Sequence, residues 1–151
     1  MKRTRRIAGH FRLALLGAVL AAGCIDPASR PTSWWIEQLR EEDPDDRRAA
    51  REQLVSRGAA AVPDLIPLLS AEDLVVAMSA ADCLGTIGPA SVPALIDALR
   101  TGPARGRGWA IHALKQIGAG ARDALPALQD ASRDPALRMS ATLAIREISG
   151  N

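Results

Sequence analysis

Val-Ala-Met-Ser-Ala-Ala-Asp-Cys-Leu-Gly-Thr-Ile-Gly-Pro-Ala-Ser-Val-Pro-Ala-Leu-Ile-Asp-Ala-Leu, residues 76–99, is one copy of a skeleton that returns along the chain in steps of 30 or 31 residues. Each copy has a large aliphatic residue, an alanine four residues before it and, in the first three copies, a glycine four residues after it. A period of this length is typical of a solenoid, in which each unit buries its apolar face only against its neighbours. The aligned positions are Leu54, Leu84, Leu114 and Ile145; Ala50, Ala80, Ala110 and Ala141; Gly58, Gly88 and Gly118.

The units are expected to be helix pairs. In residues 60–70, for example, apolar residues follow the i, i+3, i+4, i+7 spacing of one helix face. Only 3% of the chain is aromatic, which disfavours a β-sandwich or barrel. The sequence therefore predicts an all-α fold, an α-α superhelix of about four helix pairs preceded by a cleaved signal segment. The expected helices are 33–42 and 45–57, 60–70 and 73–87, 89–100 and 105–117, and 121–132 and 135–148.

Several residues are expected to set the helix ends. Ser33 is predicted to cap the first helix, and Gly58 to end the second. Pro63 and Pro93 fit the first turn of their helices, where no N–H is needed. Pro126 lies three residues later in its repeat, so that helix is expected to start late or to kink.

The first tryptophans have two interpretations. Trp34 and Trp35 either cover the open end of the solenoid or contact a bilayer interface.

A second pattern runs through the repeats: Asp43-x-x-x-Arg47-x-x-Ala50-x-x-x-Leu54, with later copies that start at Asp73, Pro103 and Asp134. With the following Ile-Gly-x-x-Ser-Val-Pro-Ala-Leu, it resembles HEAT repeats of the short type named after the phycobilin lyases. The resemblance covers residues 33–149, is clearest in the second pair, and implies a superhelix of helix pairs.

The acidic and basic residues of this pattern have their own physical interpretation. An aspartate at a helix start caps free N–H groups, and an arginine four residues later lies on the same face. The resemblance implies a structural ladder between repeats, although Ala77 and Pro103 interrupt it. Contacts from the arginines to acidic groups of a partner are the alternative. The ladder residues are Asp43, Arg47, Asp73, Arg107, Asp134 and Arg138.

The first 24 residues have the organisation of an export signal. Five basic residues and no acidic one precede or flank an uncharged run, Leu13 to Gly23, which is too short to span a bilayer. Leu20-Ala-Ala-Gly-Cys24 resembles the bacterial lipobox, which implies cleavage after Gly23 and lipidation of Cys24. An ordinary secretory signal, a twin-arginine signal at Arg5-Arg6 and a cytosolic protein are the alternatives.

The predicted domains are therefore a lipoprotein signal peptide at 1–23, the lipidated Cys24 with a linker at 24–32, and a HEAT-like repeat domain at 33–151. The expected location is the cell envelope, on the extracytoplasmic side, attached to a membrane through the lipid anchor.

Composition argues against several functions. Without residues 1–23 the chain carries 14 Lys+Arg against 17 Asp+Glu, a balance unlike that of a nucleic-acid binder. His112 is then the single histidine and is expected to be a surface or packing residue, while Cys83 is expected in the core. We therefore expect no enzyme, no cofactor, no small-molecule substrate and no metal site. A calcium site at Asp43, Asp45 and Asp46 is the alternative to simple helix capping.

The most unusual local stretch is Thr101-Gly-Pro-Ala-Arg-Gly-Arg-Gly-Trp109. Two glycines weaken the helix here, so a longer or looser turn is expected. Arg105, Arg107 and Trp109 are candidate protein-binding residues, because tryptophan and arginine are enriched among the residues that dominate binding energy. The alternative is that Trp109 packs over the space that Gly106 leaves.

The sequence thus predicts a membrane-anchored HEAT-repeat lipoprotein that acts as a scaffold and binds another protein. Two alternatives stay open. The family name suggests a chromophore-binding enzyme of the bilin-lyase type, and the absence of a polar capping repeat after the last expected helix suggests a structural module that assembles with copies of itself.

Overall fold

The computed structural model describes residues 26–150, and within this range the chain is helical and contains no strand. The predicted signal peptide at 1–23 and the predicted lipidation site, Cys24, lie outside the described residues. The repeats form one compact unit that begins at Pro31. The helices are α2 (Thr32–Gln38), α3 (Pro44–Ser56), α4 (Val62–Leu65), α5 (Leu74–Ile87), α6 (Val92–Thr101), α7 (Ala104–Ile117), α8 (Leu125–Ala131) and α9 (Arg138–Ser149). Short 3-10 segments lie at Pro27–Ser29, Gly58–Ala61, Ile66–Ser70, Gly88–Ser91 and Gly118–Ala124.

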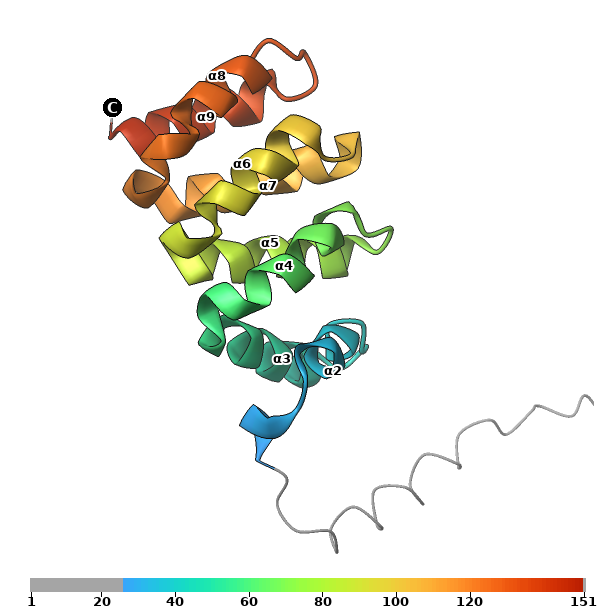
Figure 1. The fold of residues 1–151 in the computed structure, drawn as a ribbon. Coiled ribbons are helices and arrows are strands. Elements are labelled where there is room, and N and C mark those ends of the chain that lie inside the picture. Colours follow the sequence, from blue (N-terminus) through green and yellow to red (C-terminus); the bar gives the residue numbers. More distant parts are fainter. Residues whose placement is uncertain (1–25, 151) are drawn as a thin grey trace, which may run out of the picture. The chain divides into compact units, whose positions relative to one another are not determined.

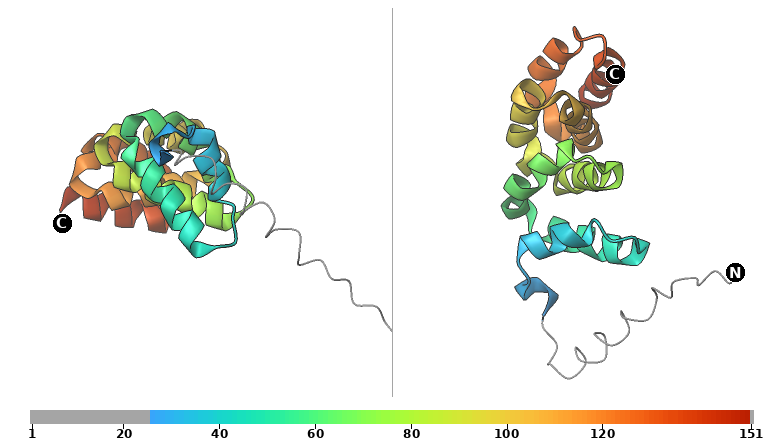
Figure 2. Two further views of the ribbon diagram at one scale, coloured as in Figure 1. Left: turned by 90° about the horizontal axis from the view of Figure 1, so that it is seen from below. Right: turned by 90° about the vertical axis from the view of Figure 1, so that its right-hand side faces the viewer.

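The helices form four antiparallel pairs that follow one another along a stack, as Figure 1 and the right-hand view of Figure 2 show. The second helices of the pairs, α3, α5, α7 and α9, contact each other in sequence order. The first helices make the other layer, in which α6 packs against α8. The predicted all-α superhelix of four pairs is confirmed.

The repeated residues meet at the centre of this stack. Leu54, Leu84 and Leu114 are fully buried, and so are the four aligned alanines. The small alanines allow neighbouring helices to approach, and the leucines fill the space between layers. Ile145, the fourth aligned aliphatic residue, is only partly buried at the end of the stack.

Glycines close the hairpins. Gly58, Gly88, Gly118 and Gly150 all have positive φ angles, between 55° and 80°, a region that residues with a β-carbon rarely adopt. At the second hairpin the buried hydroxyl oxygen of Ser91 lies 2.7 Å from the carbonyl oxygens of both Leu84 and Gly88. The end of α5 therefore receives a side-chain hydrogen bond in place of the missing helical one.

The first pair differs from the prediction at its ends. Ser33 does not cap α2, because the helix already begins at Thr32, after Pro31, and it ends at Gln38 rather than at residue 42. After the helix, the guanidinium of Arg47 donates hydrogen bonds of 2.7 and 2.8 Å to the carbonyl oxygens of Glu41 and Glu42, which fix the connection between α2 and α3.

Prolines divide two of the first helices. Residues 60–70 form not one helix but α4 followed by a 3-10 segment, because Pro67 has no N–H to continue the α-helical ladder. The expected late start of the helix around Pro126 is confirmed: α8 begins at Leu125 after the 3-10 segment Gly118–Ala124, which is non-helical at Ala121. The last helix begins at Arg138, three residues later than predicted.

Trp34 and Trp35 lie in the first pair with their rings edge to face, 4.5 Å apart between centroids. Trp35 is buried in the core cluster, and Trp34 packs against it from a partly exposed position. In the linker, Pro27–Ser29 forms a 3-10 turn capped by Asp26, whose carboxylate accepts a hydrogen bond from the backbone N–H of Ala28.

One helical run, Leu74–Thr101, is long and apolar enough to cross a membrane by length and composition. It consists of α5, the 3-10 segment Gly88–Ser91 and α6, so the chain turns back within it at Gly88. More than half of the most apolar window is buried inside the repeats. The run therefore consists of the second helix of the second pair and the first helix of the third pair, joined by the turn at Gly88.

Candidate interaction surface

The turn before α7 is tight. The glycines predicted a longer or looser connection between residues 101 and 109, and this prediction is wrong: α6 ends at Thr101 and α7 begins at Ala104. Pro103 starts the helix with a fixed φ, and its carbonyl oxygen accepts hydrogen bonds from the N–H groups of Gly106 and Arg107. The stretch that looked irregular is therefore the first turn of a regular helix.

Gly106 occupies a position of close approach. A β-carbon on it would overlap the hydroxyl oxygen of Ser70 and lie 3.5 Å from the backbone carbonyl of Leu69. The equivalent residues of the neighbouring repeats are Val76 in α5 and Leu137 directly before α9, and both are buried core residues. The end of the 3-10 segment Ile66–Ser70 fills this space, so Trp109 does not pack over a gap left by Gly106.

Trp109 instead borders a groove between α7 and α9. The groove has a volume of about 330 Å³. Gly108 forms part of its wall, and a β-carbon on Gly108 would meet no atom within 4 Å. The Trp109 ring lies edge to face with the ring of His112, 5.8 Å between centroids. The lining residues are Arg105, Gly108, Trp109, Ile111, His112, Lys115, Ser140 and Leu143.

The three candidate binding residues are not all in this groove. Arg105 and Trp109 line it, but Arg107 lies on a different face of α7, next to Asp134 in a separate hollow. His112 and Lys115, which the unusual stretch 101–109 does not include, also line the groove. Their spacing from Arg105, at i+7 and i+10, places them on its helix face and was the signal that could have found them.

The charge of the groove is positive. Arg105 and Lys115 are exposed, and within residues 26–150 neither forms an ion pair. None of the eight lining residues is acidic. The groove thus combines an aromatic ring with unpaired cations.

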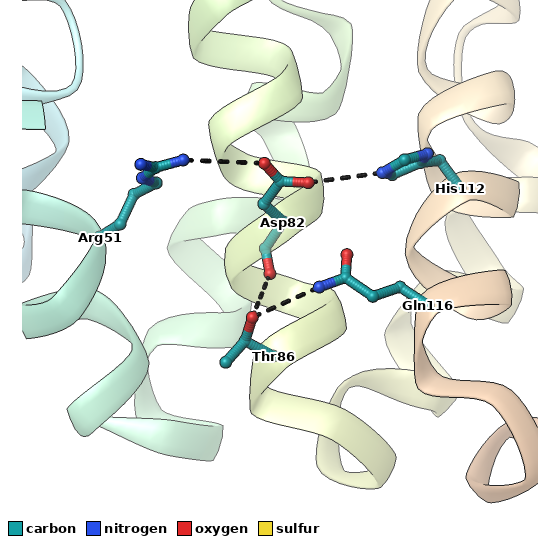
Figure 3. A network of polar contacts seen from close by, with 5 residues as sticks. All are labelled: Arg51, Asp82, Thr86, His112 and Gln116. Atoms are coloured by element: carbon teal, nitrogen blue, oxygen red, sulfur yellow. Dashed lines mark hydrogen bonds and ion pairs between the residues drawn. The ribbon is translucent and has the colours of Figure 1, made fainter. Parts of the chain in front are cut away.

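A polar network lies beside the groove and joins three repeats (Figure 3). Asp82 on α5 faces Arg51 on α3 at 3.8 Å and the Nε2 of His112 on α7 at 3.4 Å. One turn further, the Gln116 amide donates to the hydroxyl oxygen of Thr86 at 3.4 Å. His112 therefore belongs both to the groove and to a contact that positions α7 against α5.

The residues of the expected ladder make one contact between repeats, and their other contacts lie within single repeats. Arg107 lies 3.7 Å from Asp134 of the next repeat, so one contact joins neighbouring repeats. Arg47 and Arg138 instead donate to carbonyl oxygens within their own repeats, the latter to Ser132 at 3.4 Å. The aspartates cap helices: Asp43 accepts from the N–H of Asp45, Asp73 from those of Val75 and Val76, and Asp134 from that of Ala136.

Cys83 lies in the core between α5 and its neighbours and is 1% exposed. Burial raises the pKa of its thiol to about 12, and the nearby Arg51 guanidinium opposes this only in part. The thiol is thus held neutral, which is the opposite of the lowered pKa that activates a nucleophilic cysteine.

A second hollow lies over the other layer, between the two segments of the second pair and α6. It is larger, at about 660 Å³, and is lined mainly by aliphatic and proline side chains, among them Pro63, Ile66, Pro67 and Ala98. Asp97 is the only charged residue of its lining. It offers no cation and no aromatic ring.

Part of the chain matches a known protein family. Residues 32–115 match the family described as HEAT repeats. The match begins with the first residue of α2 and ends within α7, so it spans the first three pairs almost completely. No curated protein and no solved structure matches the chain.

Proposed function

The chain belongs to the HEAT repeat family, and on that basis we propose that it is a scaffold that binds another protein and is attached by a lipid to a membrane of the cell envelope. HEAT repeats generally mediate protein–protein interaction. Stacked helix pairs of this kind offer extended surfaces for a partner. The proposed location is the extracytoplasmic side of the membrane.

The groove at Trp109 is the observation that carries the binding role. A partly exposed tryptophan, flanked by an arginine and a lysine that form no ion pair within residues 26–150, is the kind of site that dominates the energy of protein interfaces. The side chains of Arg105 and Lys115 are exposed and contribute little to folding, whereas the ring of Trp109 is partly buried against the core and partly open to the groove. Their presence at this position is better explained by a partner than by stability.

A non-catalytic role agrees with the chemistry of the groove and its surroundings. The imidazole of His112 faces the carboxylate of Asp82, but the neighbouring thiol of Cys83 is buried and held neutral. A catalytic pair of this kind needs an accessible nucleophile within hydrogen-bond reach. Co-expression with a bilin chromophore tests the enzymatic alternative, since bound pigment would add a visible absorbance that the scaffold role does not produce.

Membrane attachment rests on the sequence of the first 24 residues. A basic start, a short apolar run and Leu20-Ala-Ala-Gly-Cys24 together support lipidation of Cys24. Two or three acyl chains hold a protein firmly, because each buried CH₂ adds about 0.8 kcal/mol. In cells grown with labelled palmitate, Cys24→Ala should abolish labelling and release the protein from membranes, whereas Cys83→Ala should leave both unchanged. Incorporation of labelled palmitate into the Cys24→Ala variant would contradict lipid attachment through Cys24.

The binding role is tested in native membranes. Chemical crosslinking of the intact protein, followed by mass spectrometry, should recover a protein covalently linked to residues of α7 or α9. Recovery of the chain alone, at crosslinker concentrations that capture known membrane complexes, would contradict the scaffold proposal.

Self-assembly is the second candidate, and one observation favours it. On the last pair, the apolar side chains of Met139 and Leu143 are 75% and 42% exposed. A second copy could cover them. Light scattering on the Cys24→Ala protein separates the two roles, because self-assembly predicts a concentration-dependent mass and hetero-binding predicts a monomer.

A further inference from the structure

The wall of the groove has a notch at Gly108. At the equivalent positions of the neighbouring helices α5 and α9, the chain carries methionines, Met78 and Met139, which are 42% and 75% exposed. Gly108 interrupts this row of flexible apolar side chains, and a β-carbon there would meet nothing within 4 Å. Methionines are frequent on surfaces that adapt to binding partners. Gly108 therefore leaves a position without a side chain in the wall of the groove, beside Trp109.

Cations lie at both ends of the notch along α7. Arg105, Gly108, His112 and Lys115 follow the spacing i, i+3, i+7, i+10, so they share one face of the helix. Ten residues of helix rise about 15 Å, which sets the separation of Arg105 and Lys115 along the axis. Other basic residues in residues 26–150, such as Arg51, Arg107 and Arg133, lie within 4 Å of a carboxylate.

We propose that this groove binds an acidic segment of the partner protein, with one large apolar side chain in the notch over Gly108 and carboxylates at Arg105 and Lys115. This proposal rests on the protein-binding role and specifies its site and ligand. The charge of the lining supports an acidic ligand, because the groove holds cations and no carboxylate. Its shape supports a peptide: about 330 Å³ between two helices accommodates a side chain.

The acidic residues next to the groove limit how the segment lies. Beyond His112 and Lys115 the adjoining surface carries Asp82 and Glu147. Continued acidic sequence would meet like charges there, which disfavours binding. The carboxylates of the ligand therefore belong over the part of α7 between Arg105 and Lys115.

A random-peptide library displayed on phage and selected on the full chain tests the proposal directly. The enriched peptides should carry glutamate or aspartate on both sides of a leucine, phenylalanine or tryptophan. Gly108→Met restores the residue type of the neighbouring repeats and fills the notch, and it should weaken binding of a selected peptide about 10-fold, or about 1.4 kcal/mol. The double variant Arg105→Gln and Lys115→Gln should weaken peptide binding at least as much. It should also make the affinity for the peptide less dependent on salt.

Arg122→Gln is the matched control, because Arg122 is also exposed and forms no ion pair within residues 26–150, but lies outside the groove. It should leave peptide binding unchanged, and circular dichroism should show the same helical signal for all variants. No enrichment, enrichment of neutral or basic peptides, or equal binding by Gly108→Met would overturn the proposal. If Gly108→Met crosslinks to its partner in membranes as strongly as the unchanged protein, the scaffold role stands and this site is wrong; if nothing crosslinks to any form, the scaffold role itself fails.

Discussion

Gly106 and Ser70 approach each other so closely that a β-carbon on Gly106 would overlap the hydroxyl oxygen of Ser70. The two residues come from consecutive repeats, one from the first turn of α7 and the other from the end of the 3-10 segment Ile66–Ser70. Two positions away, Gly108 faces open space. The two glycines of one sequence motif thus have opposite structural roles.

This difference predicts opposite effects of substitution. Gly106→Val introduces the residue found at the same position of α5, and overpacking should lower the free energy of unfolding by about 1–3 kcal/mol. Gly108→Ala should raise it by about 1 kcal/mol, because alanine favours the helix and meets no neighbour. Urea denaturation measures both. A smaller penalty for Gly106→Val in a Ser70→Ala background would tie the effect to this contact, and an unchanged penalty would contradict that cause.

Leu84 is fully buried at the centre of the stack, between the repeats before and after it. Leu84→Ala should lower the free energy of unfolding by about 2–5 kcal/mol, because it removes buried apolar side-chain atoms and leaves a cavity. Leu143→Ala is the control on the exposed side of α9 and should change it by only about 0.5 kcal/mol. Equal effects of the two variants would show that the core is not where we place it.

The thiol of Cys83 should be unreactive in the folded protein. Its pKa of about 12 leaves it neutral at pH 8, and burial excludes reagents, so an alkylating agent should label it only after unfolding in urea. The Cys24→Ala background provides a single thiol for this measurement. Rapid labelling of the native protein would contradict the burial of Cys83.

The raised pKa of the Cys83 thiol also makes the free energy of unfolding depend on pH in the alkaline range. The unfolded thiol ionises at its ordinary value of 9.0, whereas the folded thiol keeps its proton up to about 12. The folded state therefore binds more protons between these values, and stability falls as the pH rises from about 9 towards 12. The Cys83→Ala variant should lack this contribution. Thermal unfolding at several alkaline pH values compares the two proteins.

Asp82 joins α3, α5 and α7, but its contacts are half exposed and screened by water. Double-mutant cycles of Asp82→Asn with Arg51→Gln and with His112→Gln should each give coupling energies of about 1 kcal/mol or less. Added salt should reduce the Arg51 coupling further. A larger, salt-independent coupling would indicate that the network is buried in solution, in contradiction to the exposure seen here.

Trp109→Ala should weaken recovery of the crosslinked partner while leaving the far-UV helical signal intact, because the ring borders the groove rather than the centre of the core. Trp34→Ala, in the first pair, is the comparison that removes a tryptophan elsewhere. Equal recovery with Trp109→Ala and the unchanged protein would argue against the groove as the binding site.

Most of the fold can be predicted from the repeat period, because a fixed spacing of leucine, alanine and glycine requires every unit to adopt the same hairpin. The helix ends were less predictable because they depend on contacts made in three dimensions. Arg47, for instance, binds the carbonyl oxygens of Glu41 and Glu42 in the connection after α2, a contact that the helical pattern does not predict. The division of residues 60–70 follows from Pro67, because a second proline within a short helix removes an interior hydrogen bond.

The site was predictable only in part, for a related reason. Arg105, Arg107 and Trp109 are neighbours in sequence, but a helix distributes neighbours over different faces, and Arg107 turns away towards Asp134. The structural role of Gly106 could not be predicted from the sequence of α7 alone, because the atoms that exclude a side chain there belong to another repeat. Helical spacing within α7 would have grouped Arg105 with His112 and Lys115.

Each hairpin closes at a glycine whose backbone angle is positive, and the four joints occur at nearly equal intervals along the chain. The backbone geometry of the joints is therefore shared by all repeats, whereas side-chain contacts such as Gly106 against Ser70 are particular to one boundary. Insertion or loss of a whole repeat would preserve the joints and require new side-chain packing only at the boundary where it occurs.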